Sequence, residues 1–121
     1  MIKKYQNYFY NCDDRGSITG IINTGTWEEM NFITSISGTV RGKHYHKKTR
    51  EGFYILEGEI QVATRNILDP ANKINEDLVC AGDFFIVEPL IIHTFTVIRN
   101  AKWINLLSLK MNDTDKDFYR E

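Results

Sequence analysis

The chain consists largely of short segments in which apolar and polar residues alternate. Ile60 and Val62 alternate with Glu59 and Gln61, for example, and this period of two is typical of strands with one buried face. Most of these segments are rich in β-branched and aromatic residues, which are favoured in strands. The pattern predicts strands at residues 17–23, 31–37, 52–56, 59–64, 83–88, 93–99 and 103–109.

Turn residues separate the predicted strands. A tight hairpin is expected at Glu57-Gly58, because such a turn needs the positive φ that glycine adopts without steric cost. Residues 68–77 are the longest polar insertion and predict a surface loop between hairpins. Many short strands joined in this way favour an all-β fold, an antiparallel sandwich or barrel.

The C-terminal residues 111–121 are the part of the chain that departs from the strand pattern. They are predominantly polar, and Asp113 or Thr114 is suited to the N-cap position of a helix. A side-chain oxygen at that position accepts a hydrogen bond from a free N–H group in the first turn. We therefore expect a turn or two of helix here.

The composition is that of one globular domain spanning residues 1–121. Its 42% of hydrophobic residues, with seven Phe, six Tyr and two Trp, can fill one core. Because 15 basic residues face 16 acidic ones, neither nucleic acid nor an anionic membrane is expected as a partner. Cys12 and Cys80 are unpaired in pattern, and no apolar run has the length of a signal peptide or a membrane span. A cytoplasmic location is predicted.

Three histidines and one glutamate are the candidate chemical groups. On a strand, residues i and i+2 share a face, so His44 and His46 project together while Tyr45 points the other way. Glu51 begins the next strand, and a barrel can bring His93 beside it. Alone, each is more often an ordinary polar residue, but all three histidines of the chain belong to this set. Three imidazoles and one carboxylate suit zinc, iron, manganese, nickel or cobalt, and the ligands do not choose among these ions.

The order of these residues resembles the two motifs of the cupin superfamily. The first motif, with glycines around an HxH pair and a glutamate, is present as Gly38, Gly42, His44, His46, Glu51 and Gly58. The second is present as Gly82, Pro89 and His93. The usual glycine between proline and histidine is missing from "PLIIH", and Val97 replaces the trailing asparagine. The resemblance covers about residues 14–110 and implies a conical β-barrel with the site inside its wide end.

Two stretches narrow the resemblance to the sugar-nucleotide cupins of polysaccharide biosynthesis: "DDRGSITGI" at 13–21 and "GTVRGKHYHKK" at 38–48. They are similar to dTDP-4-dehydrorhamnose 3,5-epimerases, and more so to the C-terminal cupin domain of capsular-polysaccharide epimerase/reductases. The resemblance implies a divalent metal ion, zinc first, on His44, His46, Glu51 and His93. It also implies an epimerase or ketoisomerase for a 4-keto-6-deoxy sugar nucleotide.

Roles for individual residues follow from that chemistry. Removing a proton beside a ketone needs a base with a pKa near neutrality and a group that stabilises the enolate. His44 is the predicted base if no metal binds it. Because Tyr45 faces away, Tyr54 or a tail tyrosine such as Tyr119 is the predicted proton donor. Arg15 and Arg41 are predicted to bind the pyrophosphate through their planar guanidinium groups, unless they are surface residues near turns. Lys43 is predicted to add positive charge.

Other functions fit the same residues, and association is expected. A non-catalytic metal- or sugar-binding cupin is one alternative, and a metal-dependent oxygenase is another, because three histidines and a carboxylate also suit iron. Small β-barrels gain from covering their edge strands, so a homodimer is predicted. The segment "YQNYFY" at residues 5–10 can lie across the sheet of a second copy.

Overall fold

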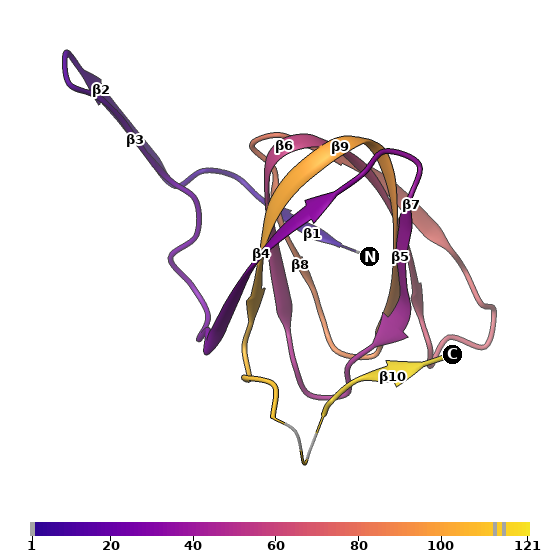
Figure 1. Cartoon of the computed structure of the whole chain (residues 1–121). Helices are drawn as coiled ribbons and strands as arrows, with labels where there is room; N and C mark the ends of the chain where they lie inside the picture. Colours follow the sequence, from indigo (N-terminus) through magenta and orange to yellow (C-terminus); the bar gives the residue numbers. More distant parts are fainter. Residues whose placement is uncertain (1, 113, 115) are drawn as a thin grey trace.

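The part of the chain that the computed structural model describes, residues 2–112, 114 and 116–121, contains strands and no helix (Figure 1). No segment of it is therefore a helix long and apolar enough to cross a membrane. The predicted all-β fold is confirmed. The strands are β1 (Lys3–Tyr5), β2 (Phe9–Asp13), β3 (Gly16–Gly20), β4 (Glu29–Ser35), β5 (Val40–Tyr45), β6 (Glu51–Asn66), β7 (Asn75–Cys80), β8 (Phe84–Val87), β9 (Ile91–Leu107) and β10 (Tyr119–Arg120).

Two long strands, β6 and β9, are neighbours at the centre of the main sheet. They pair antiparallel along nearly their whole length, from Glu51 opposite Leu107 to Asn66 opposite Ile91. Around them one sheet has the order β1-β8-β6-β9-β5-β10, with β4 also paired to β9 and β7 to β6. Figure 1 shows both strands curving over one end of the barrel, while β10 lies at the opposite end.

The predicted hairpin at Gly58 is wrong, because the chain continues there as one bent strand. The pairing of β6 with β9 shifts register around this point. Gly58 has a φ of +100°, and a Cβ added to it would lie 2.4 Å from the carbonyl oxygen of Asn100. Glycine is required here for the close approach of two bending strands, and β9 likewise continues as one strand through Arg99-Asn100.

Two further expectations about the chain between strands are corrected. The described part of residues 111–121 is not helical: Thr114 lies in a bend, and Tyr119–Arg120 form β10, which pairs with β5. Asp113, the alternative helix cap, lies outside the described residues. The predicted surface loop at 68–77 is shorter than expected, because β7 begins at Asn75. In both places long-range pairing supplies the backbone hydrogen bonds.

The core is a cluster of aromatic rings. The ring centroid of Phe53 lies 5.2 Å from that of Phe85, 5.1 Å from that of Phe95 and 5.4 Å from that of Trp103. All four rings are buried. His93 borders this cluster, with its ring 5.3 Å from Phe95. The candidate site therefore lies directly against the hydrophobic core.

A hairpin of β2 and β3 projects from the barrel (Figure 1). In the described residues these two strands pair only with each other. Phe9, Tyr10 and Ile18 on this arm are exposed. An isolated two-stranded hairpin is marginally stable in water, so these side chains are available for a further contact.

Candidate metal centre and cavity

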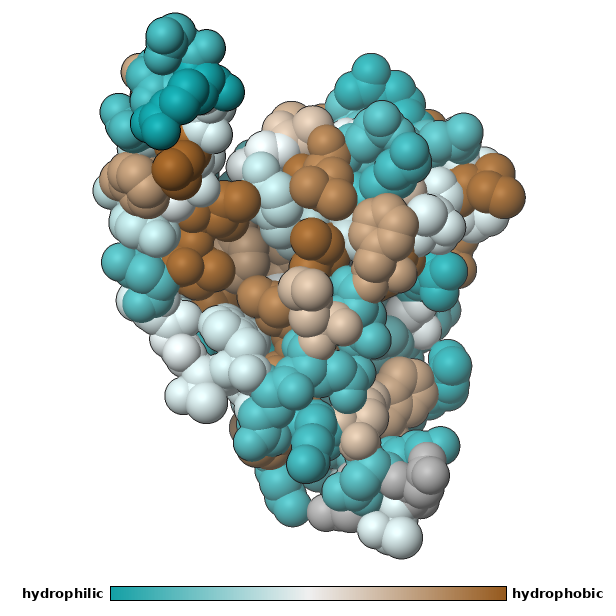
Figure 2. Space-filling model, turned by 60° about the vertical axis from the view of Figure 1, so that its left-hand side comes forward, coloured by the Kyte–Doolittle hydropathy of each residue, from teal (hydrophilic) through white to brown (hydrophobic). Residues whose placement is uncertain are grey.

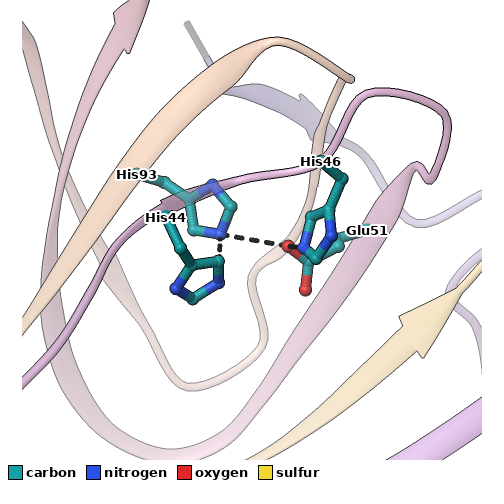
Figure 3. A group of neighbouring side chains, drawn as sticks. All are labelled: His44, His46, Glu51 and His93. Carbon is teal, nitrogen blue, oxygen red and sulfur yellow. Dashed lines mark hydrogen bonds and ion pairs between the residues drawn. The ribbon is translucent and has the colours of Figure 1, made fainter. Parts of the chain in front are cut away.

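The structure brings His44, His46, Glu51 and His93 together at the wide end of the barrel (Figure 3). One ligand atom from each lies within 4.8 Å of every other. His44 comes from β5, His46 directly follows it, Glu51 begins β6 and His93 lies near the start of β9. His46, Glu51 and His93 are buried, and His44 is half-buried.

Gly42 explains how β5 presents His44 to His93. Gly42 pairs with Thr94 and His44 with His93, so the register shifts and Lys43 is the extra, bulged residue. A Cβ on Gly42 would lie 2.4 Å from the carbonyl oxygen of His93. Only glycine permits this approach, and the bulge redirects the following side chain into the barrel. The Nε2 atoms of His44 and His93 are consequently 3.0 Å apart.

His46 is held by the turn before β9 as well as by β5. The carbonyl oxygen of His46 accepts a hydrogen bond of 2.7 Å from the N–H of Leu90. Leu90 has a φ of 67°, a left-handed conformation that glycine adopts at lower cost. The leucine in "PLIIH" therefore keeps a turn geometry in which glycine would be expected.

Two of the imidazoles have their orientation fixed by main-chain carbonyls. Nδ1 of His46 contacts the carbonyl oxygen of Asp117, and Nδ1 of His93 lies 3.0 Å from that of Ile91. A carbonyl oxygen only accepts, so each Nδ1 carries a hydrogen, and the lone pair of the neutral ring is on Nε2. Such carbonyl bonds are typical of histidines that ligate metals.

The two Nε2 atoms converge on one carboxylate oxygen. Oε1 of Glu51 lies 2.7 Å from Nε2 of His46 and 3.0 Å from Nε2 of His93. His46 Nε2 and Glu51 Oε1 are both buried, and among the described residues no hydrogen-bonding group outside the cluster satisfies either atom. Asn105 donates to the other oxygen, Oε2, at 3.0 Å. Imidazole lone pairs and a carboxylate repel one another unless a proton or a metal cation lies between them, so the cluster can hold a metal ion.

The cluster also shifts the pKa values of its members. Burial and the neighbouring His93 lower the pKa of His44 to about 4. Burial opposes the charged form of His46, but the hydrogen bond and charge of Glu51 raise its pKa above the ordinary value. Burial likewise opposes ionisation of Glu51, yet His46 and His93 hold its pKa well below the usual range. At neutral pH Glu51 is therefore ionised and His44 is neutral.

A cavity of about 690 Å³ opens from this cluster. Its wall is partly aromatic, from Phe53, Phe95, Trp103 and Phe118. Three basic side chains also line it: Arg41, Lys43 and Arg120. The size is within the range of small-molecule sites, and the basic residues favour an anionic ligand.

Arg41 and Lys43 were predicted from the sequence, whereas Phe118, Arg120 and Asn105 were not. Phe118 directly precedes the short strand β10, and Arg120 lies on it; both line the cavity, whereas Tyr119 between them does not. The alternation in "FYR" was the one sequence feature that could have indicated these two cavity residues. Three residues are too few to distinguish a strand from a polar tail.

The structure does not bring Arg15 or Tyr54 to the cluster. Arg15 lies at the tip of the arm, where its guanidinium is 2.7 Å from Asp13 and largely exposed. Tyr54 alternates along β6 with the inward-facing Phe53 and Ile55 and is not among the residues that line the cavity. Within one chain, the predicted pyrophosphate contact of Arg15 and the predicted proton donor at Tyr54 have no support in this placement.

The antiparallel barrel with a histidine and glutamate cluster inside its wide end defines the chain as a cupin, as the motifs predict. A family model described as "Polysaccharide biosynthesis C-terminal domain" matches residues 11–114. This is most of the chain, and the chain belongs to that family. No curated protein matches it.

Solved structures share the fold at low sequence identity. The capsular polysaccharide assembling protein CapF from Staphylococcus aureus matches with a TM-score of 0.72 and 22% identity over 93% of this chain and 33% of CapF. The chain thus spans about a third of the length of CapF.

Two similar structures are nearer to this chain in length. The dTDP-4-dehydrorhamnose 3,5-epimerase from Sulfolobus tokodaii has a TM-score of 0.74 and 15% identity over 93% of this chain and 77% of its own. The 3,4-ketoisomerase QdtA from Thermoanaerobacterium thermosaccharolyticum, in complex with TDP-4-keto-6-deoxyglucose, has a TM-score of 0.75 and 16% identity over 99% and 87%. These likenesses establish the cupin fold of this chain.

Proposed function

We propose that the protein is an epimerase or ketoisomerase of a 4-keto-6-deoxy sugar nucleotide in surface polysaccharide biosynthesis. The observation that carries this proposal is the neutral His44 imidazole at the base of a 690 Å³ cavity with three basic side chains in its wall. Phosphate oxygens fit the basic side chains, and the aromatic wall fits the faces of a sugar or base. The names of the similar cupins support this substrate class.

When no metal ion binds His44, the reaction begins with proton abstraction by this residue. A neutral Nε2 or Nδ1 takes the proton from the carbon beside the ketone, the C–H electron pair forms a C=C bond, and the carbonyl pair moves to oxygen. The lowered pKa keeps His44 in this proton-accepting form at pH 7. Return of the proton to the opposite face gives the epimer. Proton transfer between the enediol oxygens, followed by protonation of the former carbonyl carbon, moves the ketone instead.

A divalent metal ion, zinc first, is part of the proposal. His46, His93 and Glu51, with His44, are the residues that would hold it, and iron, manganese or nickel would fit the same donors. When bound, such an ion would act as a Lewis acid toward the substrate ketone. His44 cannot ligate a metal through a nitrogen and use that same nitrogen as the base, so occupancy decides which role it has.

Metal binding is testable without an activity assay. Chelation is expected to lower the Tm of the purified protein and zinc to restore it, with about 2.7 kcal/mol of stabilisation at a zinc concentration 100 times the Kd. His46→Ala should abolish this restoration. A wild-type protein that contains no metal and shows no shift with zinc, iron, manganese or nickel would overturn this part of the proposal.

Deuterium exchange tests the reaction itself. Protein with its metal left in place is incubated in D2O with dTDP- and UDP-linked 4-keto-6-deoxy sugars, and the mass of the sugar is followed. We expect incorporation with the wild type and its loss with His44→Ala. Tyr54→Phe should retain exchange, because the hydroxyl lies on the other face of β6. No exchange with any substrate would favour a binding protein, and iron content with oxygen uptake would favour an oxygenase.

A homodimer in the cytoplasm completes the proposal. In the described residues β4 pairs only with β9, which leaves one edge of β4 open, and Met30 and Phe32 on it are 69% and 62% exposed. Figure 2 shows hydrophobic side chains gathered between the arm and the barrel. A second copy that covers both surfaces would remove the open edge and support the arm. Cys12 and Cys80 are exposed free thiols, which fits a reducing compartment.

A further inference from the structure

The C-terminal segment of residues 116–121, called the strap below, lies against the candidate site although it is far from the cupin motifs in sequence. It joins the barrel through β10, where Tyr119 pairs with Tyr45 and Arg120 with His44. Figure 1 shows it running past the wide end of the barrel beside β5. The strap contributes little to the hydrophobic core, so its dense contacts with the site require another explanation.

Asp117 anchors the strap to the turn that follows His46. Its carboxylate accepts hydrogen bonds of 2.8 Å from the main-chain N–H groups of Lys47, Lys48 and Thr49, and one of 2.9 Å from the Thr49 hydroxyl. One carboxylate therefore satisfies three consecutive N–H groups. The turn and the strap hold each other in a fixed relative position.

The same residue sets the orientation of His46. The main-chain carbonyl of Asp117 accepts a hydrogen bond from Nδ1 of His46. This contact leaves Nε2 directed at Glu51, 2.7 Å away. Without the strap, water would compete for Nδ1, and either tautomer and ring orientation would become accessible.

Phe118 holds the second imidazole. Its ring stacks on that of His44, with centroids 4.6 Å apart and an interplanar angle of 29°. It also meets the ring of His46 edge-on, at 6.0 Å and 68°. His44 is half-buried, and Phe118 covers one face of its ring.

Arg120 lies on β10, two residues after Phe118, and also reaches the cavity. Its guanidinium lies 5.2 Å from the centroid of Phe118 and lines the cavity with Arg41 and Lys43. Its own protein contact, to the carbonyl oxygen of Gly42, is long at 3.4 Å. Its other guanidinium N–H groups make no hydrogen bond within the described residues, so they can meet an anionic ligand. Tyr119, between these two residues, instead stacks on Tyr45 at 5.5 Å.

We propose that the strap is a working part of the site: Asp117 and Phe118 position His46 and His44, and Arg120 binds the diphosphate of the nucleotide-sugar substrate. The role of Arg120 rests on the proposed function, whereas the positioning roles stand on the protein alone. Arg120, Arg41 and Lys43 together present three positive charges, and a guanidinium matches phosphate oxygens with two parallel hydrogen bonds.

Positioning is tested by ¹⁵N NMR of the imidazoles in metal-free protein. Phe118→Leu is compared with Tyr119→Leu, which removes a ring from the opposite face of the same strand. We expect the ring-current shift of the His44 imidazole signals to be lost with Phe118→Leu and to remain with Tyr119→Leu, because only Phe118 stacks on His44. Removal of residues 116–121 should also abolish the Nδ1–H tautomer preference of His46. Circular dichroism reports whether each variant is folded, and unchanged histidine spectra in folded variants would overturn the positioning roles.

Diphosphate binding is tested by calorimetry with dTDP and UDP. Arg120→Gln is expected to weaken binding about tenfold to a hundredfold, the effect of losing one or two charged hydrogen bonds. Arg99→Gln, at the bend of β9 away from the cavity, is the matched control and should bind as the wild type does. Equal binding by both variants would overturn the role of Arg120. Absence of binding to the wild type would overturn the proposed function together with that role, while the NMR result would still decide the positioning roles.

Discussion

At the scale of the residue, the site depends on atoms that are missing as much as on those present. The absence of a Cβ on Gly42 lets β5 approach the carbonyl of His93, and the bulge at Lys43 then turns His44 inward. The glycine of the "RGKH" stretch is therefore part of the geometry of the cluster. Ligand residues alone would not assemble it.

A methyl group at position 42 should be costly. In Gly42→Ala the new Cβ would meet the His93 carbonyl oxygen at 2.4 Å, and a φ of +123° is strained for alanine. We expect a loss of about 2–4 kcal/mol in the free energy of unfolding, measured by chemical denaturation. Gly38→Ala is the control: its φ is +86° but nothing lies within 4 Å, so about 1 kcal/mol is expected. Equal losses in both variants would contradict the steric argument.

The protonation of His44 gives a second prediction. Its pKa is lowered to about 4 by burial and by His93, whereas an unfolded chain titrates near 6.5. Between these two pH values the unfolded state binds more protons than the folded state does. The free energy of unfolding therefore falls as the pH drops from about 6.5 to 4. NMR titration of metal-free protein should show a midpoint near 4 for His44, and near 6.5 in denaturant. A folded-state midpoint of 6.5 or higher would contradict this environment.

At the scale of the element, the two long strands and the strap determine the positions of the site residues. In the pairing of β6 with β9, Glu51 lies opposite Leu107 and His93 lies opposite Thr64, so the two ligands are at opposite ends of the pair. The bend that both strands make around Gly58 closes the barrel and brings the two ligands together. The strap adds Asp117 and Phe118 from the other end of the sequence. Each of these elements is held mainly by long-range contacts rather than by its own propensity.

Replacing the Asp117 carboxylate with an amide should weaken the attachment of the strap to the turn after His46. Asp117→Asn removes the charge and one acceptor oxygen, so we expect the free energy of unfolding to fall by about 1–2 kcal/mol at pH 7. Burial opposes ionisation, but the three N–H groups and Thr49 hold the pKa of Asp117 below its ordinary value. Its contribution is therefore complete above pH 3.8 and is lost as the pH falls through the folded-state pKa. The two proteins should converge in strong acid.

Urea denaturation across this pH range makes the measurement. Asp14→Asn, an exposed aspartate at the tip of the arm, is the control and should change stability by less than about 0.5 kcal/mol. A constant difference between wild type and Asp117→Asn down to the lowest pH would mean that the charge of the carboxylate is not the cause.

At the scale of the whole molecule, the barrel has an unpaired strand edge along β4 in the described residues. The arm projects from it, and the open edge of β4 lies on the face where Figure 2 shows hydrophobic side chains. Large apolar side chains on an edge strand mark an association surface, because both the backbone groups and the apolar area are available. The proposed homodimer uses this surface.

One charge on that surface should separate the dimer. Phe32→Glu places a carboxylate in the middle of β4, and we expect the mass in sedimentation equilibrium to fall from twice the chain mass to the chain mass of 14.1 kDa. Leu78→Glu on β7, where the side chain is 53% exposed, is the control and should remain dimeric. A wild-type protein that is monomeric at all concentrations would contradict the homodimer.

The sequence predicted the all-β class and the convergence of the four candidate ligands, but it misplaced the Gly58 turn and the tail. The turn was missed because a glycine in a tight hairpin and a glycine at a close crossing of two strands have the same local sequence. Residues 111–121 were assigned a helix because their polar composition resembles a capped start. Only the pairing of β10 with β5 makes Tyr119–Arg120 a strand.

What the sequence by itself determined is local: the period of two that makes strands, and the spacing that puts His44 and His46 on one face away from Tyr45. What only the tertiary structure decided is the meeting of distant segments. It joined Arg120 and Phe118 to the cavity, and it left Arg15 on the arm and Tyr54 on the other face of β6. The physical reason is that periodicity fixes which face a side chain occupies, whereas its neighbours are fixed by long-range strand pairing and close packing.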